Sequence, residues 1–331
     1  MRALVMTAPG GSENSEVREV DVPHPGPGEV SVDVAYAGLN FVDVMARRGD
    51  SGYAAHWPHV PGLEISGTVR ELGPGVTGLS VGDRVAAVPT GRGLSEVAVA
   101  RAELVVAVPD AVPLRQAAAT PLGLATALLL LTDAGRFRPG DSVLVHSAGG
   151  GIGSAIAQLV PLLGGGRLIG TVGRPEKAAD VEKGGYDIGL ARGDGLAEAI
   201  RAATDGHGVD LVLDPLGTTA LALDLDVAAP GGRIVLFGNA GGGTLDALPP
   251  AGRLLAGNLT VTGFSHRGLV AAAPARVAAA TSRILAFLAE GRLTLPLTEL
   301  PSLAEVPAAH DLLAEGRATG KYVARVSAVR P

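Results

Sequence analysis

The sequence contains no cysteine. Disulfides, a thiol nucleophile and every zinc site that relies on thiolate ligands are therefore excluded. There is also no run of lysine and arginine, and the formal net charge is -6, so that a nucleic-acid partner is not expected. No stretch of about 20 uninterrupted apolar residues occurs, and the first residues show no long apolar segment with a cleavage site. We expect a cytoplasmic protein that does not enter the membrane.

The composition is typical of a well-buried globular chain. Of the 331 residues, 47% are hydrophobic and 18% are charged, and the mean hydropathy is +0.32. A chain of this length has room for two domains, each with its own core. The 48 glycines reflect a compositional bias as well as structure. We therefore give weight to a glycine only where it falls at the spacing of a motif.

The pattern of the chain changes near Pro121. Before it, over residues 1–120, short apolar or alternating runs are separated by Pro, Gly and Asp clusters, which predicts a mostly β domain. Over residues 121–262, helical and strand segments alternate, which is typical of a doubly wound parallel sheet. Residues 263–331 continue with a helix, an extended segment, a short helix and a closing strand.

A glycine-rich turn follows the strand expected at residues 142–146. It reads Ser147-Ala148-Gly149-Gly150-Gly151-Ile152-Gly153. In a dinucleotide-binding fingerprint, Gly150 would permit close approach of a pyrophosphate, and Gly153 would let the helix pack on the strand. The amides at the start of the helix would then face the pyrophosphate. The first position of the fingerprint holds Ala148, and the alternative is an ordinary glycine-rich turn; the surrounding strands and helix favour a dinucleotide.

The end of the next strand indicates which dinucleotide is bound. It reads Gly170-Thr171-Val172-Gly173-Arg174-Pro175-Glu176-Lys177, with no acid at the strand end for the ribose hydroxyls. Arg174 and Lys177 follow at once and suit a 2'-phosphate, so NADPH is favoured over NADH. The alternative is that the two are solvated surface cations.

Five segments form a joint pattern that is specific in this order, although each is weak alone. They are Pro27-Gly28-Glu29-Val30, Ala37-Gly38-Leu39-Asn40-Phe41-Val42-Asp43, Val60-Pro61-Gly62-Leu63-Glu64-Ile65-Ser66-Gly67, Val81-Gly82-Asp83-Arg84-Val85 and Pro139-Gly140-Asp141-Ser142-Val143-Leu144-Val145-His146. With them the chain resembles, nearly end to end, the zinc-free quinone oxidoreductase (zeta-crystallin-like) branch of the medium-chain dehydrogenase/reductase superfamily. The resemblance implies an α/β protein, commonly a homodimer. Its GroES-like, mostly β catalytic domain would comprise residues 1–120 and 263–331, and its Rossmann NADPH-binding domain residues 121–262.

The resemblance also implies a reaction without metal. Zinc-dependent relatives place a His directly before the glutamate of the Pro-Gly-x-Glu segment and a Cys shortly after the Ala-Gly segment. This chain has Leu63 at the first place and Asn40 or a neighbour at the second. We interpret Glu64 as structural, an acid in a loop that needs amide partners.

Further cofactor contacts are implied position by position. Thr126 matches a threonine near the nicotinamide, Asp214 begins a segment like the family's Asp-x-x-Gly, and Arg192 stands beside Ala191, where the family has a tyrosine near the 2'-phosphate. Loop residues among these have turn or capping roles as their alternative. The expected cofactor-binding residues are Asn40, Thr126, Ser147, Gly149, Gly150, Gly151, Ile152, Gly173, Arg174, Lys177, Arg192, Phe237, Gly238, Asn239, Phe264, Ser265 and Lys321.

Asn40 and Tyr53 are the candidate catalytic residues. The neutral amide of Asn40 suits the oxygen of an enolate or quinol, and its alternative is to satisfy backbone groups in a loop. Tyr53 is a candidate proton donor, with water, His56 and His59 as alternatives. The family's tyrosines in this region fall on other residues here, so we expect an altered substrate pocket.

These expectations combine into one function. We expect NADPH-dependent, metal-free reduction of a quinone or a related α,β-unsaturated carbonyl by hydride transfer. The alternatives are an enoyl-thioester (enoyl-CoA or acyl-carrier) reductase and a non-catalytic NADPH-binding protein. The expected partner is a small quinone or enone, with neither nucleic acid nor a membrane involved.

Overall fold

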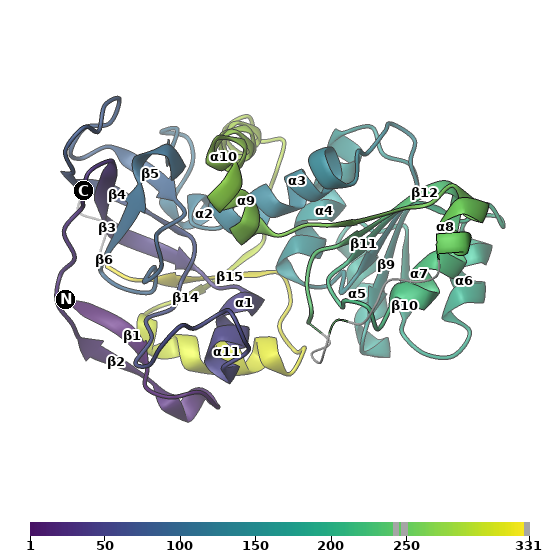
Figure 1. Cartoon of the computed structure of the whole chain (residues 1–331), viewed down its shortest axis with the longest axis horizontal. Coiled ribbons are helices and arrows are strands. Elements are labelled where there is room, and N and C mark those ends of the chain that lie inside the picture. The colour runs from purple at the N-terminus through teal and green to yellow at the C-terminus, as the bar shows by residue number, and fades with distance from the viewer. Residues whose placement is uncertain (241–244, 246–250, 328–331) are drawn as a thin grey trace. The chain divides into compact units, whose positions relative to one another are not determined.

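The computed structural model describes residues 1–240, 245 and 251–327 (Figure 1). Contacts divide the chain into two units, Met1–Ala125 with Leu269–Pro331 and Thr126–Gly268. The chain passes from one unit to the other slightly later than at the expected boundaries of 120/121 and 262/263. Each unit is described by itself.

The first unit is built around a seven-stranded sheet. Its strand order is β14-β15-β3-β4-β5-β7, and β6 pairs with β3 as well. The closing strand β15 runs antiparallel to β3, with Val323 opposite Gly38, so the end of the chain completes the sheet that the beginning starts. The strands are β3 (Glu29–Gly38), β4 (Ile65–Leu72), β5 (Arg84–Ala87), β6 (Val97–Arg101), β7 (Val105–Ala107), β14 (Leu297–Leu300) and β15 (Lys321–Arg325), beside the separate pair β1 (Arg2–Met6) and β2 (Ser15–Glu19).

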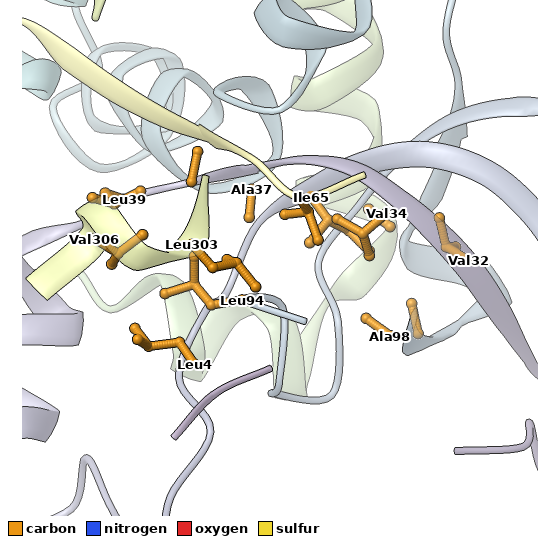
Figure 2. Packing of buried hydrophobic residues seen from close by; sticks show 14 of the residues in the cluster. Leu4, Val32, Val34, Ala37, Leu39, Ile65, Leu94, Ala98, Leu303 and Val306 are labelled. Carbon is orange, nitrogen blue, oxygen red and sulfur yellow. The ribbon is translucent and has the colours of Figure 1, made fainter. Parts of the chain in front are cut away.

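The core of the first unit forms on one face of this sheet. Val30, Val32 and Val34 alternate along β3 and are fully buried, as a period of two requires for side chains on one face. Figure 2 shows Leu4 and Leu303 packed in the same cluster. The helical segments are η1 (Ser12–Asn14), α1 (Phe41–Arg48), η2 (Ala102–Leu104), α2 (Leu114–Ala117), η3 (Thr120–Leu124), α10 (Pro274–Ala289), η6 (Leu303–Glu305) and α11 (Val306–Ala314).

The second unit contains a six-stranded, wholly parallel sheet (Figure 1). Its order is β10-β9-β8-β11-β12-β13, which is the 3-2-1-4-5-6 order of a Rossmann sheet. The central strand β8 is buried over its whole length, as is typical of a parallel strand that is covered on both faces. Its first three residues are apolar, and the last is His146. The strands are β8 (Val143–His146), β9 (Leu168–Val172), β10 (Ile188–Ala191), β11 (Val209–Asp214), β12 (Ala228–Leu236) and β13 (Thr260–Gly263). The helical segments are α3 (Ala125–Leu129), η4 (Leu130–Ala134), α4 (Gly151–Leu162), η5 (Pro175–Lys177), α5 (Ala178–Lys183), α6 (Leu196–Ala203), α7 (Leu221–Val227) and α8 (Ala251–Gly257). The predicted fold class is confirmed.

Within the described part of the chain, no single helix is long and apolar enough to cross a membrane. Only α9 (His266–Ala272) and α10 taken together meet the length and composition required, across a bend of 117°.

Candidate functional site

The glycine-rich turn joins β8 to α4 in the second unit. At Gly153 an added Cβ would lie 2.2 Å from the carbonyl oxygen of Ala148, so only glycine lets the helix lie this close to the turn. At Gly149 and Gly150 the nearest protein atoms would be 3.8 Å and 3.4 Å from an added Cβ, which is ordinary contact. The protein itself therefore does not require glycine at these two positions, and a glycine there is consistent with the close approach of a ligand.

The N-terminus of α4 adds a charge preference to that space. Gly150 precedes the helix with extended backbone, at φ -83° and ψ 175°, and Gly151 and Ile152 form its first turn. The amides at the start of a helix have no partner within it and carry partial positive charge. The glycines of the turn and the start of the helix together fit the pyrophosphate of a dinucleotide.

Three cations gather where β9 and β10 end. The guanidinium of Arg192 reaches Ser147, with 3.4 Å between its Nη1 and the Ser147 Oγ. An added Cβ at Gly173 would lie 2.6 Å from the Arg192 Nη2, so the glycine makes room for this guanidinium. Burial, and next the positive charge of Arg174, lower the pKa of Lys177. A cluster of like charges on this edge favours a bound anion.

The loops that follow β11 and β12 share this edge of the sheet. The Pro215 carbonyl accepts the amide of Ala240 at 2.9 Å, and an added Cβ at Gly238 would lie 2.7 Å from the same oxygen. Neighbouring parallel strands end at one edge, so this close packing places Phe237, Gly238 and Asn239 on the edge that carries the glycine-rich turn. The structure thus brings these two loops together, and their contact with a cofactor stays a prediction.

Three other expected cofactor residues are described by their local surroundings. Ser265 accepts the amide of Gly268 at 3.1 Å and so caps the start of α9, and the Phe264 amide bonds to the Leu236 carbonyl at 2.8 Å. Thr126 lies in α3, where its hydroxyl is buried without a hydrogen-bond partner. Contact of these residues with a cofactor stays a prediction.

His146, the residue that opens the glycine-rich turn, belongs to a buried polar group whose association the sequence did not predict. The His146 ring bonds through Nδ1 to the Thr171 hydroxyl at 2.7 Å and through Nε2 to the Asp224 carboxylate at 2.8 Å. Asp214, the last residue of β11, is also fully buried. Burial, and next the negative charge of Asp224, raise the pKa of Asp214 to about 7.

The first unit holds a second buried network, centred on Glu64. Its Oε2 accepts the amides of Leu122 and Gly123, each at 3.0 Å, and its Oε1 accepts the Lys321 ammonium and the Asn40 amide, the latter at 2.9 Å. The interpretation of Glu64 as a structural acid with amide partners is confirmed. Its pairing with Lys321 was not predicted.

Hydrogen bonds fix both the side-chain amide and the backbone amide of Asn40 within this network. Its Nδ2 donates to Glu64 at 2.9 Å and to the Gly38 carbonyl at 3.4 Å, and its Oδ1 accepts from Lys321 at 2.8 Å. Its backbone amide donates to Asp43 at 2.9 Å, and burial raises the pKa of that carboxyl to about 6. The structure thus brings Asn40 and Lys321 together, and their roles toward substrate and cofactor stay predictions.

Tyr53 lies in the turn after α1 and is 38% exposed. His59, nearby in the sequence, is fixed by a reciprocal pair of backbone bonds with Met6, each 2.8 Å long. Burial and then the charge of His56 lower the pKa of His59. Whether either residue moves a proton stays a prediction. Among the residues that the structure describes, no group of three or more His, Asp or Glu is arranged to hold a metal.

A GroES-like β unit together with a Rossmann sheet and its glycine-rich turn defines a medium-chain dehydrogenase/reductase. Residues 26–110 match the family described as Alcohol dehydrogenase GroES-like domain, and residues 151–284 match Zinc-binding dehydrogenase. The quinone oxidoreductase of Pseudomonas aeruginosa is 34% identical over 331 residues, covering 97% of this chain and 98% of that protein. The chain belongs to the zinc-free quinone oxidoreductase branch of this superfamily, as its motifs predicted.

Other relatives differ in length. The human synaptic vesicle membrane protein VAT-1 homolog-like is 36% identical over 241 residues, which are 72% of this chain and 56% of that protein. The chain thus matches little more than half the length of that relative. A phenolphthiocerol/phthiocerol polyketide synthase subunit of Mycobacterium tuberculosis is 34% identical over 97% of this chain and 14% of its own length. Among solved structures, Escherichia coli quinone oxidoreductase complexed with NADPH has a TM-score of 0.88 at 27% identity, covering 98% of this chain and 100% of that one.

Proposed function

We propose that this chain is an NADPH-dependent oxidoreductase that reduces a quinone or a related α,β-unsaturated carbonyl without a metal. Bound NADPH would supply the hydride. The observation that carries the proposal is the glycine-rich turn at the start of α4, where the protein's own packing does not require Gly149 and Gly150, on the edge that also carries Arg174, Lys177 and Arg192. The NADPH-bound structure of the Escherichia coli relative supports the choice of cofactor.

The residues of the second unit would hold the cofactor by charge and shape. The first amides of α4 would bind the pyrophosphate, with Gly149 and Gly150 leaving it room. Arg174, Lys177 and Arg192 would bind the 2'-phosphate, for which guanidinium groups are well suited because they donate two parallel hydrogen bonds. The loop at 237–239 would cover the nicotinamide ribose.

In the first unit, we assign to Asn40 the stabilisation of the substrate oxygen. Its two amide hydrogens already bond within the protein, but unequally, since the bond to Gly38 is 3.4 Å long and the bond to Glu64 is 2.9 Å. The longer bond is the weaker one and is the one to exchange for a substrate oxygen. Glu64 and Lys321 would meanwhile fix the orientation of the amide. Tyr53, partly exposed, is the proposed proton donor.

A second candidate function is supported by one finding. The polyketide synthase subunit matches 97% of this chain, which is compatible with the reduction of an enoyl thioester. Both substrates are electron-poor alkenes conjugated to a carbonyl, so the same residues would serve either. The two functions differ in the substrate and not in the cofactor site.

Oxidation of NADPH with four acceptors tests the proposal: a benzoquinone, phenanthrenequinone, a simple enone and crotonyl-CoA. Turnover of a quinone or the enone supports the leading proposal, and turnover of crotonyl-CoA alone supports the second. Binding of NADPH without turnover of any acceptor would overturn both.

The assay is repeated after exhaustive chelation, which should leave the rate of NADPH oxidation unchanged. Loss of activity that zinc restores would overturn the metal-free mechanism. Size-exclusion chromatography with light scattering tests the proposed homodimer.

A further inference from the structure

Three ionisable side chains are buried together directly beside the glycine-rich turn. His146 is the last residue of β8 and is followed by Ser147 of the turn. Its Nε2 lies 2.8 Å from the Asp224 Oδ1, and both side chains are fully buried. Asp214, fully buried at the end of the neighbouring strand β11, feels the charge of both of these residues.

The two carboxylates of this group repel each other, and a proton on one of them would relieve the repulsion. Within the group, a protonated imidazole offsets only one of the two buried carboxylates. The Oδ2 atoms of Asp214 and Asp224 are both buried without a hydrogen-bond partner, and a proton on either would relieve this. Arg192, which comes after β10 and lies in the proposed phosphate-binding cluster, also interacts with Asp214 through its charge and offsets part of the remaining negative charge. Burial and the charge of Asp224 raise the pKa of Asp214 to about 7.

The same side chains hold the backbone of the proposed cofactor site. Asp214 accepts the Leu216 amide through Oδ1 at 2.6 Å, at the start of the loop that contacts residues 237–240. Thr171, which bonds to the His146 ring, also accepts the Ala148 amide through its carbonyl at 3.0 Å. A change of charge in the group is therefore transmitted to both the turn and the loop after β11.

We propose that His146, Asp214 and Asp224 share one proton that positions the cofactor site, and that this proton favours the binding of NADPH. The inference rests on the proposed NADPH site. When the proton is present, the group adds less negative charge beside the phosphates. When it leaves, one further negative charge remains buried beside the turn and opposes the anionic cofactor. NADPH affinity therefore falls as the pH rises through neutrality.

The experiment measures binding, without substrate. NADPH fluorescence titrations from about pH 6 to 8 should show a roughly tenfold loss of affinity in the unmodified protein, the order of magnitude for one added unit charge near an anion at an effective dielectric constant of about 20. NADH, measured in parallel, should lose affinity in the same direction although it has no 2'-phosphate, which separates this group from titration of that phosphate. Calorimetry in buffers of different ionisation enthalpy should show proton uptake when either cofactor binds near pH 7.

Asp214→Asn keeps an oxygen that can accept the Leu216 amide, and its side chain stays neutral at every pH of the experiment. Its affinity should equal the low-pH value of the unmodified protein and stay constant with pH. Asp224→Asn removes the negative charge that raises the pKa of Asp214 and should therefore move the loss of affinity to lower pH, which tests the proposal even if the first variant does not fold. Asp226→Asn, an exposed acid of the same helix α7, is the matched control and should keep the original profile.

A flat pH profile without proton uptake in the unmodified protein would overturn the inference and leave the NADPH site intact. An unchanged profile in both Asp214→Asn and Asp224→Asn would also overturn it. If neither cofactor binds at any pH, the proposed site itself is wrong and the inference is overturned with it.

Discussion

Each unit of the molecule buries a network of ionisable side chains, and the two networks are compensated differently. In the first unit, Glu64 faces the Lys321 ammonium, and both of its oxygens are filled by amides and that cation. In the second, His146 bonds to the Asp224 carboxylate and acts on Asp214 through its charge, and among the described residues one oxygen of each carboxylate has no hydrogen-bond partner. The first arrangement leaves neither oxygen of Glu64 without a partner, whereas the second leaves an oxygen on each carboxylate where a proton can bind. The first network is therefore suited to fixing Asn40, and the second to responding to the gain or loss of a proton.

Removing one partner from the compensated network should have the largest effect. Glu64→Gln leaves the Lys321 ammonium buried without its anion, which is expected to lower the free energy of unfolding by about 3–5 kcal/mol. Lys321→Met should cost a similar amount. The double variant should cost clearly less than the sum of the two, because no charge is then left unpaired.

Urea unfolding measures these differences. Glu71→Gln, which alters an exposed acid paired with His24, is the control and should leave the free energy of unfolding nearly unchanged. Additive effects of the two single variants would show that Glu64 and Lys321 do not act as a pair, and the contrast between the networks would be lost.

The second expected effect concerns the two kinds of glycine in the turn. Gly153→Ala places a methyl group 2.2 Å from the Ala148 carbonyl and should lower the free energy of unfolding by about 1–3 kcal/mol. Gly149→Ala has 3.8 Å to its nearest protein atom, so it should leave stability unchanged while it weakens NADPH binding by roughly tenfold to a hundredfold. Thermal unfolding and fluorescence titration of both variants measure this. Unchanged NADPH affinity in Gly149→Ala would place the cofactor elsewhere.

The difference between the two networks also marks what the sequence could show. The alternation of helices and strands after Pro121 and the spacing of Gly150 and Gly153 predicted the Rossmann sheet and its turn, because both depend on local periodicity. Glu64 could be recognised as an acid that needs amide partners from its loop alone. Its pairing with Lys321 could not, since 257 residues separate them.

The His146 group was missed for a related reason. Its members come from two strands and a helix, and each one alone is an ordinary residue at the end or in the middle of its element. Only the sheet order, which makes β8 the neighbour of β11, brings His146 and Asp214 together. The sequence singled out two members separately, His146 at the start of the glycine-rich turn and Asp214 as a cofactor position implied by the resemblance, but gave no sign that they meet.

The charge preference of the second unit should change by a smaller amount. Replacing Arg174 and Lys177 together with Ala is expected to narrow the preference for NADPH over NADH roughly tenfold to a hundredfold, the value of charge-assisted bonds to the 2'-phosphate. Arg192→Ala in this background should narrow it further. Lys183→Ala, at the exposed end of α5, is the control. Ratios of the two dissociation constants decide the matter, and an unchanged ratio would reject these residues as the phosphate site.

The smallest effect near neutral pH is expected at His310, an exception within the first unit. It is fully buried in α11, and neither ring nitrogen has a hydrogen-bond partner. Burial, and next the charge of Arg47, lower the pKa of His310 to about 3, so the folded protein keeps it neutral while the unfolded chain binds a proton below pH 6.5. The free energy of unfolding should therefore fall between pH 6.5 and 3, by up to about 1.4 kcal/mol per pH unit from this residue. His310→Leu should remove that part of the slope and change little above pH 7, whereas His207→Leu, at an exposed histidine, should not. Urea unfolding at several pH values gives the slope of the free energy of unfolding against pH with and without His310. An unchanged slope would show that the acid sensitivity of the first unit comes from other groups, and it would remove His310 as the exception to the compensation seen at Glu64.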